Sequence, residues 1–122
     1  MEAKQMNNKY IVYVGGAYGG KEENKKLIED AIKDLKEKRM SRVGNGLHYS
    51  SSNTVYFSPV HAFGWQYEET DYLEGLDYCL AMLDKCDELL LLDNWMESTG
   101  AKIEYGFAKA KGIPIKIAKG SK

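Results

Sequence analysis

The sequence is poor in the features that mark several large classes of protein. It has two cysteines, Cys79 and Cys86, and a formal net charge of -1. It also lacks any apolar run near the roughly 18 residues that a membrane helix needs. Few cysteines argue against a disulfide framework and favour a reducing, cytoplasmic setting. The balanced charge gives no support to DNA or membrane binding, so neither a nucleic acid nor a membrane is expected as a partner.

Other signatures are missing as well. The N-terminal residues Met1–Met6 are too polar for a signal peptide. No Gly-x-Ser-x-Gly elbow occurs, which argues against a hydrolase of the Ser-His-Asp type. The two histidines and two cysteines do not follow the ligand spacing of a zinc site. We therefore expect no metal and no cofactor.

What remains is the composition of an ordinary globular chain. The 122 residues are 43% hydrophobic and 29% charged, and this length suffices to bury a core. The sequence shows no internal repeat and no linker. We expect a single domain that spans residues 1–122.

Apolar runs and helical periods alternate along the chain. Residues 10–14, 54–57, 88–93 and 113–117 are typical of strands, and residues 22–38, 71–85 and 99–111 of amphipathic helices. The connections are too long for hairpins, so the pattern predicts an α/β fold with a doubly wound, parallel sheet of four to five strands. Pro114 cannot donate to a ladder, which predicts that the last strand lies at an edge.

Two segments read as loops. Residues 41–53 are rich in glycine, serine and asparagine, and exposed loops of this length are often functional. The loop at residues 60–70 carries rings at alternate positions: His61, Phe63, Trp65 and Tyr67. Two interpretations stay open for these rings. They cover one end of the core, or they stack on a nucleobase or contact another subunit.

A glycine loop follows the first expected strand. Gly15 and the pair Gly20-Lys21 match part of a P-loop, but Glu22 replaces the Ser or Thr that would hold magnesium. A P-loop nucleotidase is therefore disfavoured. A glycine turn before a helix still offers backbone amides to a single phosphate. The alternative is a tight turn without a ligand.

A second candidate site follows the third expected strand. The segment Ser98–Glu104 opens a helix at the edge of the sheet where open α/β folds bind ligands. Glycoside chemistry commonly uses two carboxylates, one as nucleophile and one handling protons. Glu104 is the candidate nucleophile, and Asp77 or Asp71 are candidates for the second carboxylate. The alternative for each is a solvated residue on a helix surface.

Taken together, these motifs resemble the nucleoside 2-deoxyribosyltransferase superfamily, and within it a small branch near the 2'-deoxynucleoside 5'-monophosphate N-glycosidases. The resemblance covers nearly the whole chain and is most specific in the block from Trp95 to Ala108. It also includes the glycine loop, Ser58-Pro59, Cys86-Asp87 and Gly112-Ile113-Pro114. The resemblance implies a flavodoxin-like or Rossmann-like three-layer sandwich and a retaining attack on the anomeric carbon.

The resemblance also implies roles for individual residues. Glu104 matches the nucleophile, and Ser98 matches a residue that helps to hold the 5'-phosphate in the monophosphate hydrolases. The loop residues Gly16, Ala17, Tyr18 and Gly19 match the segment around the same end of the substrate. Gly15 belongs to this loop, Gly100 to the Ser98 block, and Tyr13 matches an aromatic position on the first strand.

The chain departs from the family at two points. Cys79 stands where the second carboxylate is expected, and the glycine loop has no arginine, so Lys21 would supply the countercharge of a phosphate. Asp77, two residues before Cys79, lies on a different face of the expected helix, and it remains the preferred partner of Glu104.

From these residues we expect an N-glycosidase or deoxyribosyltransferase-like enzyme that acts on a nucleotide or nucleoside. Its base would stack on Trp65, Phe63 or Tyr67, and His61 is placed with the substrate-binding residues. The alternative is a nucleotide-binding module of the same fold without turnover. The resemblance implies a homodimer or a higher homo-oligomer.

Overall fold

The computed structural model describes residues 9–40 and 54–118. The strands are β1 (Tyr10–Gly15), β2 (Thr54–Phe57), β3 (Glu88–Leu91) and β4 (Ile115–Ile117). The long helices are α2 (Glu22–Met40), α5 (Tyr72–Leu83) and α6 (Thr99–Lys111). The short ones are α3 (Pro59–Phe63), α4 (Trp65–Glu69) and the 3-10 turn η1 (Trp95–Glu97). The loop expected at residues 41–53 lies outside the described residues.

The strands form one parallel sheet in the order β2-β1-β3-β4. The predicted fold class is therefore confirmed, with four strands, and β4 lies at an edge as Pro114 predicted. After β1 the chain first adds a strand on one side and then two strands on the other. The switch point consequently lies between β1 and β3, where Gly15 is paired with Leu91.

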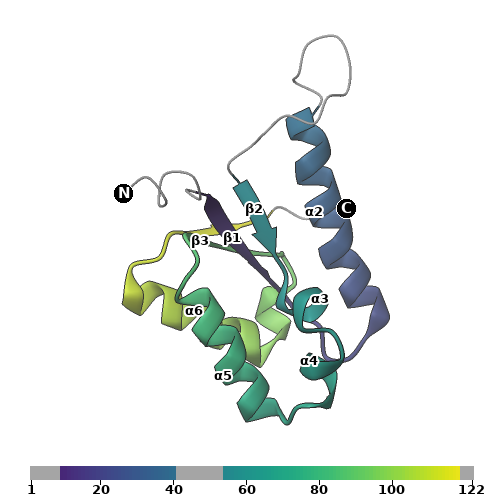
Figure 1. Ribbon diagram of the computed structural model, residues 1–122, viewed down its shortest axis with the longest axis vertical. Helices are drawn as coiled ribbons and strands as arrows, with labels where there is room; N and C mark the ends of the chain where they lie inside the picture. The colour runs from purple at the N-terminus through teal and green to yellow at the C-terminus, as the bar shows by residue number, and fades with distance from the viewer. Residues whose placement is uncertain (1–8, 41–53, 119–122) are drawn as a thin grey trace.

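Helices cover both faces of the sheet (Figure 1). Successive side chains of β1 alternate between the two faces. Tyr13 packs with α5 and α6, in a core that also contains Leu83, Leu89 and Ala108. Val12 and Val14 pack on the opposite face against Ile28 of α2. The two layers of helices thus bury separate cores against one sheet.

The segment at residues 60–70 differs from the prediction, because it folds into α3 and α4 rather than a loop. Pro59 begins α3, a position where its missing N–H costs nothing. Gly64, with a φ of 57°, separates the two helices. Each has only five residues, too short to show a helical period in the sequence.

Three further elements, α5, β3 and β4, are shorter than predicted. Helix α5 ends at Leu83, so Cys86 follows the helix, and the third strand ends at Leu91. Both cysteines are buried as free thiols in one core. In the part of the chain that the structure describes, no helix is long and apolar enough to cross a membrane.

Candidate active site

A cleft of about 880 Å³ opens at the carboxyl edge of the sheet. Three segments line it: the loop after β1 with the first turn of α2, the segment from α4 into α5, and the segment from η1 into α6. The first and third of these follow β1 and β3, the strands on either side of the switch point. Open α/β sheets bind their ligands at this place.

Glu104 lies at the floor of the cleft. Helix α6 brings it there, and Ser98 caps that helix by accepting a hydrogen bond from the Ala101 N–H at 3.0 Å. Only 7% of Glu104 is exposed. The hydroxyl of Tyr13, on β1, donates a hydrogen bond of 2.7 Å to Oε2 of Glu104. A buried carboxylate is thus fixed by an aromatic side chain from the central strand.

Gly15 makes room for this carboxylate. A Cβ atom at position 15 would stand 2.8 Å from Oε1 of Glu104, closer than real Cβ contacts. Tyr13 and Gly15 are not among the lining residues, and both lie against Glu104. The structure therefore brings these three predicted site residues together.

Burial and hydrogen bonding act in opposite directions on Glu104. Burial raises the pKa of its carboxyl group to about 7, and the hydrogen bond from Tyr13 lowers it. Burial and the nearby carboxylate of Glu104 hold the pKa of Tyr13 well above its ordinary value. Tyr13 consequently keeps its proton and remains the donor. Near neutral pH, both the protonated and the ionised form of Glu104 are therefore populated.

The glycine loop contains a tight turn with two glycines at positive φ. The Lys21 N–H donates to the Tyr18 carbonyl at 2.9 Å, and the two residues between them, Gly19 and Gly20, have φ values of 55° and 76°. Only glycine adopts such φ values without strain. The side chain of Asn94, just after β3, accepts from the Ala17 N–H at 3.2 Å. The sequence reasoning missed Asn94, although a polar residue after a central strand was a usable signal.

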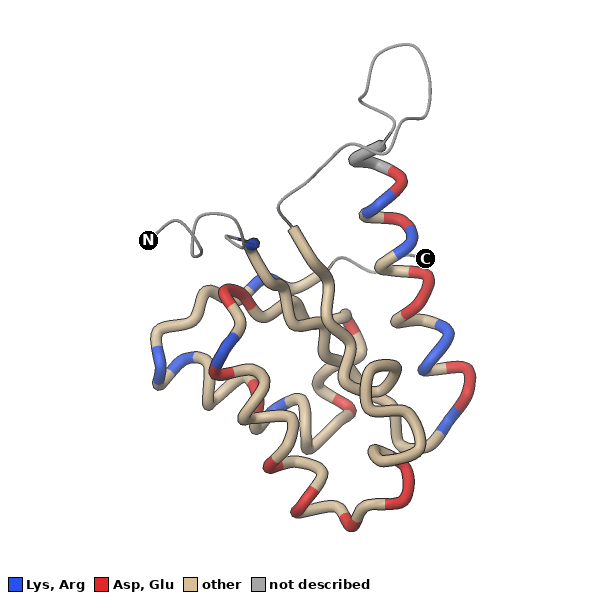
Figure 2. Tube along the Cα trace, in the orientation of Figure 1, with Lys and Arg blue, Asp and Glu red and all other residues tan. Residues whose placement is uncertain are grey.

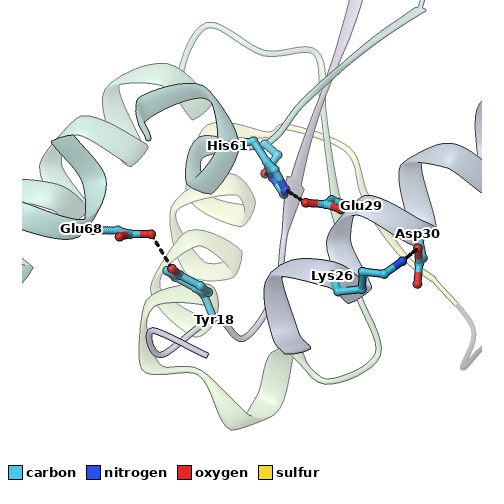
Figure 3. Close-up of polar contacts among 7 residues, drawn as sticks. Tyr18, Lys26, Glu29, Asp30, His61 and Glu68 are labelled. Atoms are coloured by element: carbon cyan, nitrogen blue, oxygen red, sulfur yellow. Dashed lines mark hydrogen bonds and ion pairs between the residues drawn. The ribbon is translucent and has the colours of Figure 1, made fainter. Parts of the chain in front are cut away.

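Tyr18 joins this loop to the opposite wall. Its hydroxyl donates to Oε2 of Glu68 on α4 at 2.8 Å, as Figure 3 shows. Its ring also packs against Tyr67, with centroids 5.8 Å apart. Tyr67, Glu68, Tyr72 and Glu97 line the cleft. Of these, the sequence reasoning singled out only Tyr67.

Ser98 and Gly100 lie in the third wall, as expected. The Ser98 hydroxyl oxygen accepts the Ala101 N–H, which leaves its own proton free to donate. A Cβ atom added to Gly100 would come 3.6 Å from the Tyr72 hydroxyl, so the two walls approach each other here. Gly16, Ala17, Tyr18 and Gly19 also line the cleft.

Three predicted site residues lie elsewhere. Asp77 is exposed on α5 and does not line the cleft, whereas its neighbour Cys79 does. Trp65 is 70% exposed and lies outside the lining as well. His61 hydrogen-bonds through its two ring nitrogens to Ser58 at 2.8 Å and to Glu29 of α2 at 2.9 Å, which ties α3 to α2 (Figure 3).

Within residues 9–40 and 54–118, no group of three or more His, Cys, Asp or Glu side chains is placed to hold a metal ion.

A family model described as "Domain of unknown function (DUF4406)" matches residues 10–117. The matched range includes all four strands and every residue that lines the cleft. No curated protein and no solved structure matches the chain.

Proposed function

Since the chain belongs to this family of unknown function (DUF4406), whose description assigns no activity, we propose a function from the cleft itself. The protein cleaves the bond between base and sugar of a nucleoside or nucleotide, with Glu104 as the nucleophile. The observation that carries this proposal is the Glu104 carboxylate, buried at the floor of a cleft at the switch point and held by Tyr13.

The resemblance of the sequence to the nucleoside 2-deoxyribosyltransferase superfamily supports the same conclusion. That superfamily uses a glutamate nucleophile, and Glu104 matches its position. The four-stranded parallel sheet is consistent with the fold that the resemblance implies. The proposal joins these two independent arguments, one from the sequence and one from the geometry.

The reaction follows from the contacts of Glu104. One carboxylate oxygen attacks the anomeric carbon of the sugar, and the bond to the base breaks. Water or a second base then attacks the same carbon and releases Glu104. Tyr13 holds the carboxylate in one orientation, and burial keeps it weakly solvated, which increases its reactivity. The ionised form predominates above the pKa of about 7.

The rest of the cleft positions the substrate. The free proton of the Ser98 hydroxyl and the amides of the glycine loop are donors for the 5' end of the sugar. Tyr72, which is 58% exposed and lines the cleft, offers a ring for the base. The proposal gives no role at the substrate to Asp77, His61 or Trp65, because none of them lines the cleft.

The rival function is a binding module that holds a nucleotide without turnover. Cys79 favours it, because this buried thiol lies in the cleft where the resemblance expects a second carboxylate. The two functions differ in one measurable respect, the release of free base.

The test is chromatography of free base after incubation with each deoxynucleoside and each deoxynucleoside 5'-monophosphate. We expect release by the wild type and a loss of about 10³-fold or more in Glu104→Gln, which keeps an acceptor for Tyr13. Glu23→Gln, at an exposed position of α2 outside the cleft, is the matched control and keeps the wild-type rate. Tight binding without release supports the binding module. Release that Glu104→Gln leaves unchanged overturns the proposed nucleophile.

We also propose that the protein works in the cytoplasm as a homo-oligomer. Two free thiols fit a reducing compartment. Trp65, at the start of α4, and Tyr72 and Leu73, at the start of α5, expose 70%, 58% and 73% of their surfaces, which suits a contact between subunits. Sedimentation of the wild type and of Leu73→Glu tests the assembly, and a monomeric wild type contradicts it.

A further inference from the structure

Acidic side chains outnumber basic ones in the walls of the cleft. Among the described residues that line it, five have carboxylate side chains and one, Lys21, has a cationic side chain; the acids are Glu22, Glu68, Asp71, Glu97 and Glu104. The sequence has no lysine or arginine between Arg42 and Lys85, or between Lys85 and Lys102. Figure 2 shows the result, a run of acidic residues along α4 and α5 without a basic residue among them.

Three of these carboxylates are held in the acceptor role. Glu68 accepts from the Tyr18 hydroxyl at 2.8 Å, Asp71 from the Glu74 N–H at 3.0 Å, and Glu104 from the Tyr13 hydroxyl at 2.7 Å. These hydrogen bonds fix the positions of three carboxylates that line the cleft.

Aromatic rings stand among the acids. Tyr18, Tyr67 and Tyr72 line the same cleft, and Tyr18 and Tyr67 pack against each other. The face of an aromatic ring attracts a cation, and the attraction strengthens when the cation leaves water. Carboxylates combined with tyrosine rings suit a flat ligand that carries positive charge. They suit a 5'-phosphate poorly, because Lys21 is the one cationic side chain among the described residues that line the cleft.

The chemistry of the leaving group points the same way. A neutral nucleobase leaves as an anion unless an acid protonates it. The cleft has no buried carboxylic acid besides Glu104 among the described lining residues, and Cys79 replaces the expected second carboxylate. Burial raises the pKa of the Cys79 thiol to about 11, which makes it a weak proton donor. A base that already carries a positive charge leaves as a neutral molecule and needs no donor.

We infer that the preferred substrate is an N-glycoside whose base carries a fixed positive charge, such as a pyridinium or an N7-alkylated purine. This inference rests on the proposed function. Glu104 forms a bond to the anomeric carbon while the bond from that carbon to the base nitrogen breaks. The electron pair of the broken bond neutralises the charge of the ring, and the base departs without a proton. Water then displaces Glu104, and one proton passes to the solvent in each turnover.

Matched ligands that differ in charge test the inference. One pair is nicotinamide riboside and its uncharged dihydro form, and the other is 7-methylguanosine and guanosine. The bond between sugar and base is intrinsically weaker in a cationic glycoside, so such a substrate reacts faster whatever the cleft prefers. The decisive readout is therefore binding and not rate. Titration calorimetry of Glu104→Gln at low salt is expected to show the cationic member of at least one pair binding about 10-fold tighter or more. Wild-type KM values give the same comparison if the variant does not fold.

The acids themselves supply the control. Glu68→Gln and Glu97→Gln are expected to reduce the preference for the cation by several-fold each, and Glu23→Gln, outside the cleft, is expected to preserve it. Equal or tighter binding of the uncharged member in both pairs overturns the inference. If Glu104-dependent release from uncharged nucleosides accompanies that result, the proposed function stands without the inference. If no ligand is bound or cleaved, both fail.

Discussion

Two opposite effects set the protonation of Glu104. Burial raises the pKa of its carboxyl group, and the hydrogen bond from the Tyr13 hydroxyl lowers it. Its role as nucleophile requires the ionised form, so activity is expected to rise with pH through about 7 and to level off above that value.

Replacing Tyr13 with Phe removes the hydrogen bond that lowers the pKa of Glu104. The pKa is then expected to rise above its wild-type value of about 7, and the rising limb of kcat/KM should move to higher pH. The rate at high pH should fall less than the rate at neutral pH. A full pH profile of base release by the wild type and by Tyr13→Phe makes this measurement. If kcat/KM falls by the same factor at every pH and the rising limb does not move, Tyr13 has no role in setting the charge of Glu104.

The stability of the fold should depend on Glu104 in a definite direction. Its pKa is raised in the folded state, from an ordinary 4.5 to about 7, so its contribution to stability is present below pH 4.5 and is lost as pH rises through 7. Glu104→Gln stays neutral and avoids this loss. At pH 8 we expect the free energy of unfolding of the variant to exceed that of the wild type by on the order of 3 kcal/mol.

Denaturant unfolding of both proteins at pH 4 and pH 8 measures this difference. The advantage of Glu104→Gln should be near zero at pH 4 and clear at pH 8. A variant that is less stable than the wild type at pH 8 shows that the ionised carboxylate stabilises the fold, contrary to the raised pKa.

The sequence identified most of these residues but not their contacts. Glu104 and Tyr13 were both singled out, through the resemblance, yet their hydrogen bond joins residues 91 positions apart, and only the fold brings them together. Asp77 shows the converse. It was preferred as a carboxylate from the neighbouring helix, two residues before Cys79, and two positions along a helix place side chains on different faces. Cys79 therefore reaches the cleft and Asp77 does not.

At the scale of elements, β1 and α6 meet at one tight point. Gly15 on β1 leaves space for Glu104 on α6, because a Cβ atom there would stand 2.8 Å from Oε1. Gly106, on the same helix, has no neighbour within 4 Å of an added Cβ atom. Gly106 therefore serves as the control position for Gly15, because an added Cβ atom there meets no neighbour.

Gly15→Ala is expected to displace Glu104 and to lower base release by about 10-fold or more, since misplacement by a fraction of an ångström disturbs the attack. Gly106→Ala is expected to keep the wild-type rate and to stabilise the protein by about 0.5–1 kcal/mol, the usual gain of alanine over glycine in a helix. Parallel kinetic and unfolding assays check both variants. Wild-type kinetics in Gly15→Ala would show that the close approach does not position the nucleophile.

The helices and strands also show which elements the local sequence predicts and which it does not. Long helices and apolar strands were predicted with small errors at their ends, because their periods extend over many residues. The two helices at residues 59–69 were missed, because five residues give no period and their aromatic rings read equally well as a loop. One of those rings, Tyr67, lines the cleft, whereas Trp65 is mostly exposed.

At the scale of the whole molecule, the order β2-β1-β3-β4 explains why the cleft lies where it does. The chain leaves β1 and β3 toward opposite faces of the sheet, to α2 and to α6, and the loops after these two strands diverge next to Glu104. The parallel direction of the strands follows from alternation and connection length in the sequence. The charge of the cleft does not, because it depends on acids from three separate segments that only the fold brings together.

The central claim is that Glu104 becomes covalently bound to the sugar, and the direct measurement is the mass of the tryptic peptide Ile103–Lys109 after reaction. A substrate with fluorine at the 2-position of the sugar slows hydrolysis of the glycosyl ester and allows it to accumulate. The account predicts a mass increase of one sugar unit on this peptide, assigned to Glu104 by fragmentation and absent in Glu104→Gln. A sugar adduct on any other residue, or base release from that substrate in Glu104→Gln at the wild-type rate, would contradict it.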